Sequence, residues 1–231
     1  MRDVRWRVVA ACALAILAAA AGCRSAPPPP GKGTPPSAEQ LAPSQVREYQ
    51  GKKLDSITDF RENSIDGPQY VNVKTYRLSV DGLVSRPASY TYDQVLGGFK
   101  HYSKVVQLDC VEGWSAKILW EGVNVRDILA SAGVEPGAKV VILHARDGYT
   151  TSFPVEYLTG NDRLLAYKMN GVTMPPERGF PFQLVAEDRW GYKWIKWIER
   201  IELSPRTDYR GYWESRGYSN DGSRNKSFLG K

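Results

Sequence analysis

The segment VVQLDCVEGW, from Val105 to Trp114, brings together a thiol and two carboxylates that could do chemistry. Cys110 is the most reactive of these side chains, because a cysteine thiolate acts either as a nucleophile or as a metal ligand. The chain holds three cysteines, and the other two, Cys12 and Cys23, lie close to its start. The role of Cys110 therefore depends on why it stands alone in the body of the chain.

The first residues have the pattern of a secretory signal. Three arginines precede an apolar run over residues 8–21, which is shorter than the roughly 20 residues of a membrane span. Small residues directly before Cys23 resemble a bacterial lipobox, in which the cysteine becomes the lipidated first residue of the mature protein. We therefore expect a lipoprotein signal peptide over residues 1–22 and lipidation at Cys23, with an ordinary signal peptide as the alternative.

Export would explain the isolation of the third cysteine. Exported proteins usually lie in an oxidising compartment, where paired cysteines form disulfides. If Cys12 leaves with the signal peptide and Cys23 carries the lipid, Cys110 has no partner within the chain. An unpaired cysteine is either a small buried hydrophobe or a residue kept for its sulfur chemistry.

Composition divides the rest of the chain into three parts. Residues 23–48 are rich in Pro, Gly and Ser and predict a flexible tether between a lipid anchor and the body. Residues 49–210 have the size of one ordinary domain, and residues 211–231 form an aromatic and then polar tail that we expect to fray at the surface. The formal net charge is +6, but both signs are mixed along the body, so we expect no binding to nucleic acid.

The elements that must position the thiol are mostly strands. Apolar or alternating runs predict them over residues 75–84, 104–110, 139–145, 164–169, 180–187 and 198–203. Cys110 falls at the end of the second run. The dipeptide Asn170-Gly171 predicts a tight turn after the fourth run.

Two short helices interrupt these strands. Thr91 and Gln94 have the spacing of a capping box, opening a helix that the glycines at 97 and 98 stop. Asn124 can cap a second helix, whose apolar face ends at Gly133. Many strands with few helices, and no regular βαβ succession, predict an α+β fold with a mixed or antiparallel sheet.

A nucleophilic Cys110 would need a base. Asp109-Cys110 together with His144 weakly resembles cell-wall peptidases that use a cysteine and a histidine, which leaves a peptidase as one hypothesis. Against it, Cys110 ends a strand instead of opening a helix, and His144 lies inside an apolar run. The sequence has no H-E-x-x-H, CxxC or glycine-rich nucleotide motif, so local zinc and nucleotide sites are not expected.

Two blocks of sequence favour a metal ligand. The first is LDCVEGWSAKILWEGVNVRDIL, around Cys110, and the second is AYKMNGVTMPPERGFPFQLVAEDRWGYKWIKWIERIEL, around Lys196. In this order they resemble the molybdopterin-binding domain of the sulfite oxidase superfamily, closest in style to the catalytic subunit of the periplasmic methionine sulfoxide reductase. The resemblance spans roughly residues 54–204 and implies that superfamily's α+β fold, with a mixed β-sheet and short helices.

The resemblance also implies a cofactor and its ligands. One Mo-molybdopterin would bind per chain, with Cys110 as the molybdenum ligand and the catalytic residue, and soft thiolate donors suit such a metal. The remaining cofactor-binding candidates by position are Asn63, Ser64, Ala145, Arg178, Gln183, Trp194, Ile195 and Lys196. Lys196 and Arg178 would supply charge for the pterin phosphate. For Lys193 and Lys196 the simpler interpretation is an exposed edge.

Some positions depart from the family pattern. Ala145 stands where the reductase has Thr, Arg178 where it has Asn, and Gln183 where it has a phosphate-binding Arg. The signal also reads Arg5-Trp6-Arg7, without the twin-arginine pair of proteins exported with their cofactor in place. These departures leave room for a cofactor-free binding module with the same fold.

The predicted function is an extracytoplasmic, membrane-tethered oxidoreductase of the periplasmic side. It would transfer an oxygen atom to or from a small-molecule substrate. The body has no haem or iron–sulfur signature, so we expect electrons to pass through a separate partner, a haem protein.

Overall fold

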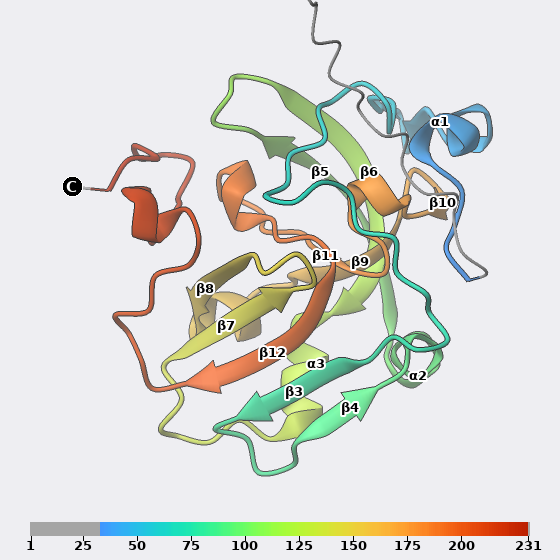
Figure 1. The fold of residues 1–231 in the computed structure, drawn as a ribbon. Coiled ribbons are helices and arrows are strands. Elements are labelled where there is room, and N and C mark those ends of the chain that lie inside the picture. Colours follow the sequence, from blue (N-terminus) through green and yellow to red (C-terminus); the bar gives the residue numbers. More distant parts are fainter. Residues whose placement is uncertain (1–32, 231) are drawn as a thin grey trace, which may run out of the picture.

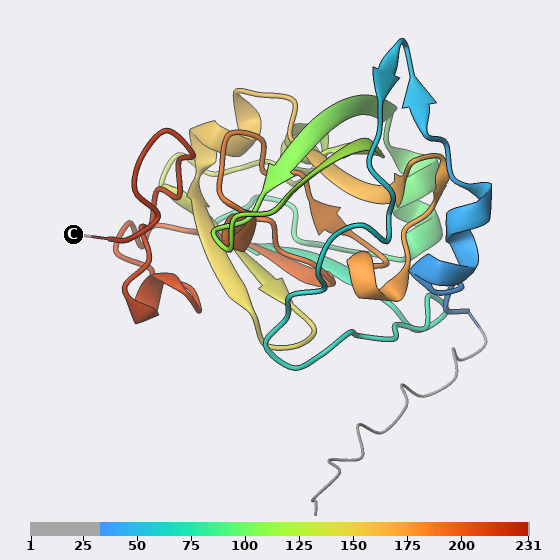
Figure 2. The same ribbon diagram turned by 90° about the horizontal axis from the view of Figure 1, so that it is seen from above.

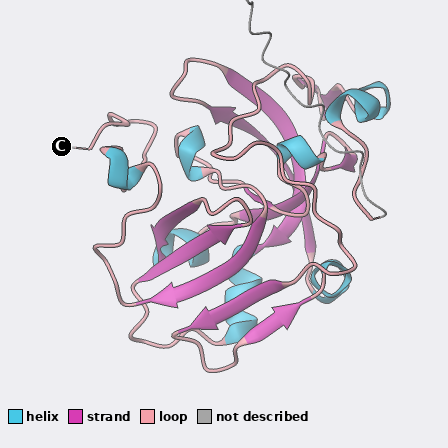
Figure 3. Ribbon diagram, in the orientation of Figure 1, coloured by secondary structure: helices cyan, strands magenta, loops and turns pink. Residues whose placement is uncertain are grey.

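The computed structural model describes residues 33–230. The predicted signal peptide, Cys23 and the first part of the predicted tether lie outside the described residues. Two five-stranded sheets form the framework of the described chain, and short helices and loops cover them (Figures 1 and 3). No helix within residues 33–230 is long and apolar enough to cross a membrane.

The first sheet carries the cysteine segment. It runs in the order β10 (Val172–Thr173), β9 (Leu164–Met169), β6 (Ser115–Asn124) and β5 (His101–Asp109), and β11 (Gln183–Leu184) also pairs with β9. All of these pairings are antiparallel. The predicted Asn170-Gly171 turn joins β9 to β10, and its two residues have φ angles of 47° and 77°, as a tight hairpin requires.

The second sheet has the order β4 (Ala88–Tyr90), β3 (Leu78–Gly82), β12 (Ile198–Ser204), β7 (Val140–Ala145) and β8 (Thr150–Pro154). The strand β12 runs parallel to β3 and antiparallel to β7, so this sheet is mixed. The predicted α+β class with a mixed sheet is confirmed. Fully buried side chains from both sheets, among them Trp120, Leu143 and Ile201, belong to one hydrophobic core.

The two predicted helices begin and end where their caps place them. The helix α2 (Tyr92–Gly98) has the complete Thr91–Gln94 capping box. Asn124 caps α3 (Val125–Ala132), and Gly133 ends it with a φ of 71°. The structure adds smaller elements: α1 (Ala38–Leu41), α4 (Val155–Thr159), the 3-10 turns η1 (Ala42–Ser44), η2 (Pro176–Arg178), η3 (Gly191–Lys193) and η4 (Glu214–Arg216), and the hairpin of β1 (Glu48–Tyr49) with β2 (Lys52–Lys53).

The strand predicted over residues 180–187 is much shorter in the structure. Only Gln183 and Leu184 pair regularly, as β11. The segment is buried between β9 and the chain before β12, because Leu184 donates to the Ile195 carbonyl and Ile198 donates to the Phe182 carbonyl. Backbone hydrogen bonds to the irregular chain before β12 thus take the place of regular strand pairing along this segment.

Parts of the predicted tether and tail are folded against the body. In the tether range, Ala38 is 1% exposed and the Val46 N–H donates to the Asn170 carbonyl at 2.8 Å. In the tail, Glu214 is also 1% exposed. The tether segment contains few large apolar residues, so its anchoring depends on polar contacts that composition does not reveal. The tail also packs through its rings, as Tyr218 does against Tyr192. The C-terminal segment lies on the opposite side of the molecule from α1 (Figures 1 and 2).

Candidate cofactor site

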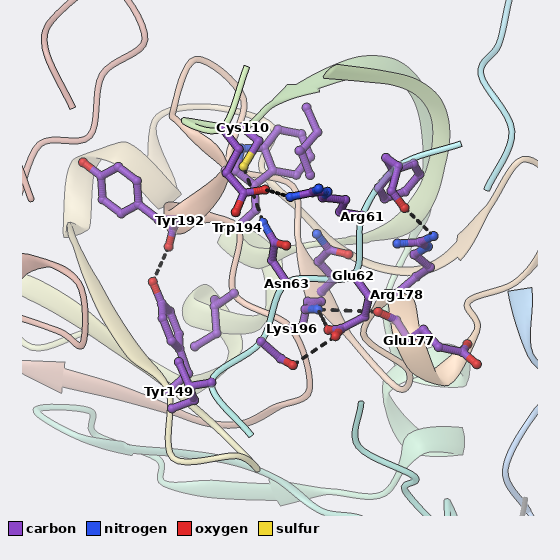
Figure 4. Close-up of a pocket in the computed structure, with 18 of the residues that line it drawn as sticks. Arg61, Glu62, Asn63, Cys110, Tyr149, Glu177, Arg178, Tyr192, Trp194 and Lys196 are labelled. Carbon is purple, nitrogen blue, oxygen red and sulfur yellow. Dashed lines mark hydrogen bonds and ion pairs between the residues drawn. The ribbon is translucent and has the colours of Figure 1, made fainter. Parts of the chain in front are cut away.

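A cavity of about 520 Å³ lies between the two sheets and the loops that connect them. Its lining comes from the end of β5, the loop over residues 60–67, the β7–β8 turn, the segment from η2 to β12 and the C-terminal segment. Figure 4 shows Cys110 at one end of this cavity and Lys196 with Arg178 further along it. Residues far apart in the sequence therefore share one pocket.

Cys110 is held at the start of the β5–β6 hairpin turn. Its N–H donates to the Trp114 carbonyl at 2.9 Å, and its own carbonyl accepts from the Gly113 N–H at 3.1 Å. On the other side stands Gly191, where an added Cβ would lie 3.4 Å from the Cys110 Cα and 3.3 Å from the Asp109 carbonyl oxygen. The close approach of η3 to the turn therefore fixes the cysteine backbone from both sides.

The thiol of Cys110 is free and 7% exposed. The Asn63 amide nitrogen lies 3.6 Å from its sulfur and donates to it. Burial raises the pKa of the thiol, and the hydrogen bonds from the backbone and Asn63 oppose that rise. The pocket thus already presents N–H donors to a negatively charged sulfur, the form in which cysteine binds a metal.

A metal at this sulfur would take its other ligands from a cofactor. Within residues 33–230, no three side chains of His, Cys, Asp or Glu converge into a metal site. A dithiolene-bearing pterin would supply the missing donors, and the cavity that holds the thiol also has two cations, Arg178 and Lys196, in its lining for an anionic group. The residues present therefore fit the cofactor that the sequence predicts.

Lys196 supplies the first of the two cations. Its Nζ atom lies 2.5 Å from a carboxylate oxygen of Glu62 and 4.2 Å from the ring centroid of Trp197. Burial lowers the pKa of Lys196, and the Glu62 carboxylate acts against that shift. The simpler expectation of an exposed edge is wrong here, because the Lys196 side chain is 14% exposed.

Arg178 supplies the second cation and also holds a loop in place. Its guanidinium donates to the carbonyls of Ile57 and Phe60, both at 2.8 Å, and lies 4.0 Å from the Phe60 ring centroid. Burial lowers the pKa of Arg178. Its charge faces the pocket while two of its N–H groups are used by the loop that carries Asn63.

Eight of the nine predicted site residues line this one cavity. They are Asn63, Ser64, Cys110, Arg178, Gln183, Trp194, Ile195 and Lys196. Ala145 does not line it: this residue ends β7, and its N–H donates to the Tyr149 carbonyl at 2.9 Å. The family's Thr contact has no counterpart there, because the Ala side chain has no polar atom.

The peptidase hypothesis loses its base. His144 lies on β7, where its Nε2 is 2.8 Å from a Glu202 carboxylate oxygen and 3.4 Å from the Arg200 guanidinium. It is not among the residues that line the cavity with Cys110. The described part of the chain does not bring the cysteine and this histidine together.

Sequence reasoning missed several lining residues, including Arg61, Glu62, Asp147, Glu177, Trp213 and Tyr218. The first two adjoin Asn63 in the segment DFRENSIDG and could have been included with it. Asp147 lies at the turn between β7 and β8, where its position follows from the fold alone. The two aromatic residues belong to the tail, which we expected to fray at the surface, so no place in the site was predicted for them.

Comparison with known proteins identifies the class. Residues 65–213 match the family described as the oxidoreductase molybdopterin binding domain, and the chain belongs to this family. It is an oxidoreductase whose cofactor is Mo-molybdopterin.

Individual relatives agree with that class. The chain is 36% identical over 154 residues to the uncharacterized oxidoreductase YuiH of Bacillus subtilis, which covers 66% of this chain and 77% of the relative. It is 34% identical over 155 residues to the putative protein-methionine-sulfoxide reductase subunit YedZ1 of Azospira oryzae, covering 67% and 58% of the two chains. With the protein-methionine-sulfoxide reductase catalytic subunit MsrP of Xanthomonas campestris it shares 27% identity, covering 86% and 69%.

A solved structure supports the fold. The sulfane dehydrogenase SoxCD from Paracoccus pantotrophus is similar with a TM-score of 0.60 and 26% identity. The match covers 67% of this chain and 43% of the solved chain, so this protein spans less than half of that neighbour.

Proposed function

We propose that this protein is an extracytoplasmic oxidoreductase that transfers an oxygen atom to or from a small substrate, with Cys110 as the molybdenum ligand. The observation that carries the proposal is geometric. Cys110 and two cations, the buried Arg178 and the partly buried Lys196, open onto one cavity, the arrangement that a metal–pterin with a terminal phosphate needs.

The protein side of the chemistry is binding and orientation. Lys196 and Arg178 provide positive charge for the phosphate, and the Asn63 amide donates to the Cys110 sulfur. When bound, the cofactor supplies two-electron oxygen-atom transfer. The aromatic side chains of Phe60 and Trp114, stacked with ring centroids 5.6 Å apart, line the cavity and help to exclude water near the sulfur.

The names of the relatives suggest sulfoxide reduction as the direction. In that reaction the sulfur–oxygen bond breaks, two electrons and two protons are taken up, and a thioether and water leave. The electrons would come from a separate haem protein, since the body carries no haem or iron–sulfur signature. Lipidation at Cys23 would hold the enzyme at the membrane on the periplasmic side, where that partner could reach it.

A second candidate is a cofactor-free binding module. Gln183 replaces a cation that the family uses for the phosphate, and Glu62 already neutralises Lys196. Both features weaken the attraction of the pocket for an anion.

Metal analysis separates the two candidates. The mature protein is purified from cells that make the pterin, and molybdenum is measured per chain alongside the Cys110→Ser and Ser115→Ala variants. Ser115 is the matched control because it lies exposed in the same hairpin. The proposal expects about one molybdenum per chain in the wild type and the control, and none in Cys110→Ser. A metal-free wild type would overturn the proposal and leave the cofactor-free binding module as the candidate.

A further inference from the structure

The C-terminal segment contributes one wall of the Cys110 cavity. Trp213 and Tyr218 line it together with Tyr149 and Tyr192, and we call these four residues the aromatic wall. Tyr218 lies beyond the residues that match the family, which end at 213. The family match thus includes Trp213 and stops before Tyr218.

A buried ion pair anchors the segment. Lys193 and Glu214 are both 0% exposed at their side chains, and their charged atoms lie 2.7 Å apart. The Lys193 ammonium also donates to the carbonyls of Ser152 at 2.7 Å and Asn220 at 3.1 Å. On the other side, the Thr151 hydroxyl donates to the Glu214 carboxylate at 2.6 Å. Lys193 thus joins η3, β8 and the C-terminal segment at one point.

Further contacts hold the segment close to the cysteine. The Tyr192 hydroxyl donates to the Ser219 carbonyl at 2.7 Å. Arg224 forms an ion pair with Asp109, the residue before Cys110. A wall fixed both at Lys193 and beside the cysteine stays in place while a substrate enters.

The aromatic wall presents ring surfaces to the cavity. The ring of Tyr218 has centroid distances of 5.0 Å to Tyr192 and 5.1 Å to Trp213. The hydroxyls of Tyr149 and Tyr192 donate to backbone carbonyls, which leaves their rings as the available surface. Ring surfaces of this kind favour apolar groups and sulfur atoms.

The charges of the cavity disfavour an anionic substrate. Its lining includes the cations Arg61, Arg178 and Lys196 and the carboxylates Glu62, Glu112, Asp147 and Glu177. The proposed cofactor phosphate would use Arg178 and Lys196, so neither cation is available to a substrate. Arg61 is then the remaining lining cation, and it lies 3.8 Å from Glu112. An oxoanion substrate would find carboxylates in excess and no further unpaired cation among these lining residues.

Resting on the proposed oxygen-atom transfer, we propose that the aromatic wall selects a neutral organic sulfoxide with an apolar or aromatic substituent, and that the Lys193–Glu214 pair positions this wall. The substituent packs on the rings of Trp213 and Tyr218 while the sulfoxide oxygen faces the Cys110 end of the cavity. Small sulfoxides without such a substituent make few contacts with the aromatic wall. Sulfite binds poorly because the carboxylates of the site repel its negative charge.

The test compares substrates on the purified, molybdenum-loaded enzyme with a reduced viologen as the electron donor. Methyl p-tolyl sulfoxide, dimethyl sulfoxide and, for oxidation, sulfite are the probes. Trp213→Ala and Tyr218→Ala should each lower kcat/KM for the aryl sulfoxide by roughly tenfold, mainly through KM, and change dimethyl sulfoxide by less than about threefold. Tyr218→Phe, which keeps the ring, should retain the wild-type preference. Tyr209→Ala, an aromatic truncation in the same segment outside the cavity lining, should change neither value.

The outcomes are distinguishable. A loaded wild type that reduces neither sulfoxide overturns the proposed function itself. Activity on both sulfoxides with equal losses in the two alanine variants overturns the aromatic wall, as does a preference for sulfite over the aryl sulfoxide. Molybdenum content and Tm are measured for every variant. If an alanine variant does not fold, Trp213→Leu against Trp213→Phe makes the same comparison, and equal preference in that pair overturns the proposal.

Discussion

The ammonium group of Lys196 and the carboxylate of Glu62, 134 positions apart in the sequence, meet at 2.5 Å inside the cofactor cavity. The Glu62 carboxylate thus occupies the position beside the Lys196 ammonium at which a phosphate group would be attracted most strongly. Glu62 is the immediate neighbour of Asn63, whose amide contacts the Cys110 sulfur. One short loop thus touches both ends of the proposed cofactor site.

Removing the competing carboxylate should favour cofactor retention. Glu62→Gln leaves Lys196 free for the phosphate, so pterin content after extended dialysis should rise above that of the wild type. Lys196→Ala should lower it by roughly tenfold, the equivalent of one charged hydrogen bond. Pterin fluorescence after release from the protein measures both, with the exposed Glu135→Gln as the control. Equal retention in all four proteins would show that Lys196 does not contact the phosphate.

Arg178→Lys should separate a structural role of this residue from its charge. Lysine keeps the positive charge but cannot reach the carbonyls of Ile57 and Phe60 in the fork geometry of arginine. We expect a loss of about 2 kcal/mol in the free energy of unfolding, and faster proteolysis within the loop over residues 57–67. Chemical denaturation and limited proteolysis measure these. Arg61→Lys, at a side chain that is 75% exposed, should leave both unchanged.

Asp147 should make stability depend on pH. Burial raises the pKa of its carboxyl above the ordinary 3.8. Between pH 3.8 and the raised pKa of the folded protein, the folded state holds a proton that the unfolded chain has lost. The stability of the folded state therefore falls as the pH rises through this interval. Asp147→Asn keeps an acceptor for the Tyr149 N–H and should therefore raise Tm at about pH 7.

The gain from Asp147→Asn should shrink as the pH is lowered and vanish below 3.8, where the wild-type carboxyl is protonated in both states. Thermal melts of both proteins across this range, made on the Cys110→Ser background to keep the metal out, provide the measurement. A gain that is constant with pH would mean that the charge of Asp147 is not its cause.

The buried pair of Lys193 and Glu214 should behave as a coupled unit. Lys193→Met leaves the Glu214 carboxylate buried without its cation, which should cost about 3–5 kcal/mol in the free energy of unfolding. Adding Glu214→Gln removes the stranded charge and should restore a large part of that loss. Urea denaturation of the two single variants and the double variant gives the coupling. Strictly additive losses would contradict the pairing.

Local signals in the sequence predicted local structure well. The Thr91 and Asn124 caps act within a few residues of their own positions, so the helix boundaries they predict are confirmed. The strand that delivers Cys110 was also predicted, because its apolar run is long. The parallel pairing of β12 with β3 could not be predicted in this way, since it joins residues more than 100 positions apart, as in the Arg200 and Ser79 register.

The resemblance to the family predicted most of the residues that line the cavity, because it covers the segments of the chain that carry them. Ala145 does not line the cavity, because it lies at the end of β7 and the cavity takes its lining from the turn beyond that strand. Lys193 was expected at an exposed edge and is fully buried, because its partner Glu214 lies in a tail whose composition resembles a surface segment. A charge that is buried through a distant partner leaves no pattern near itself.

The Lys193 anchor also defines how far the folding unit reaches. A chain that ended with the family match at Trp213 would keep the cysteine, both cations and every described strand. It would lose Glu214 and Asn220, which accept hydrogen bonds from Lys193. The lysine would then be a solitary charge in the protein interior, beside the cavity it helps to shape. The family match and the packed unit therefore end at different residues in this protein, because the carboxylate that pairs with Lys193 lies just beyond residue 213.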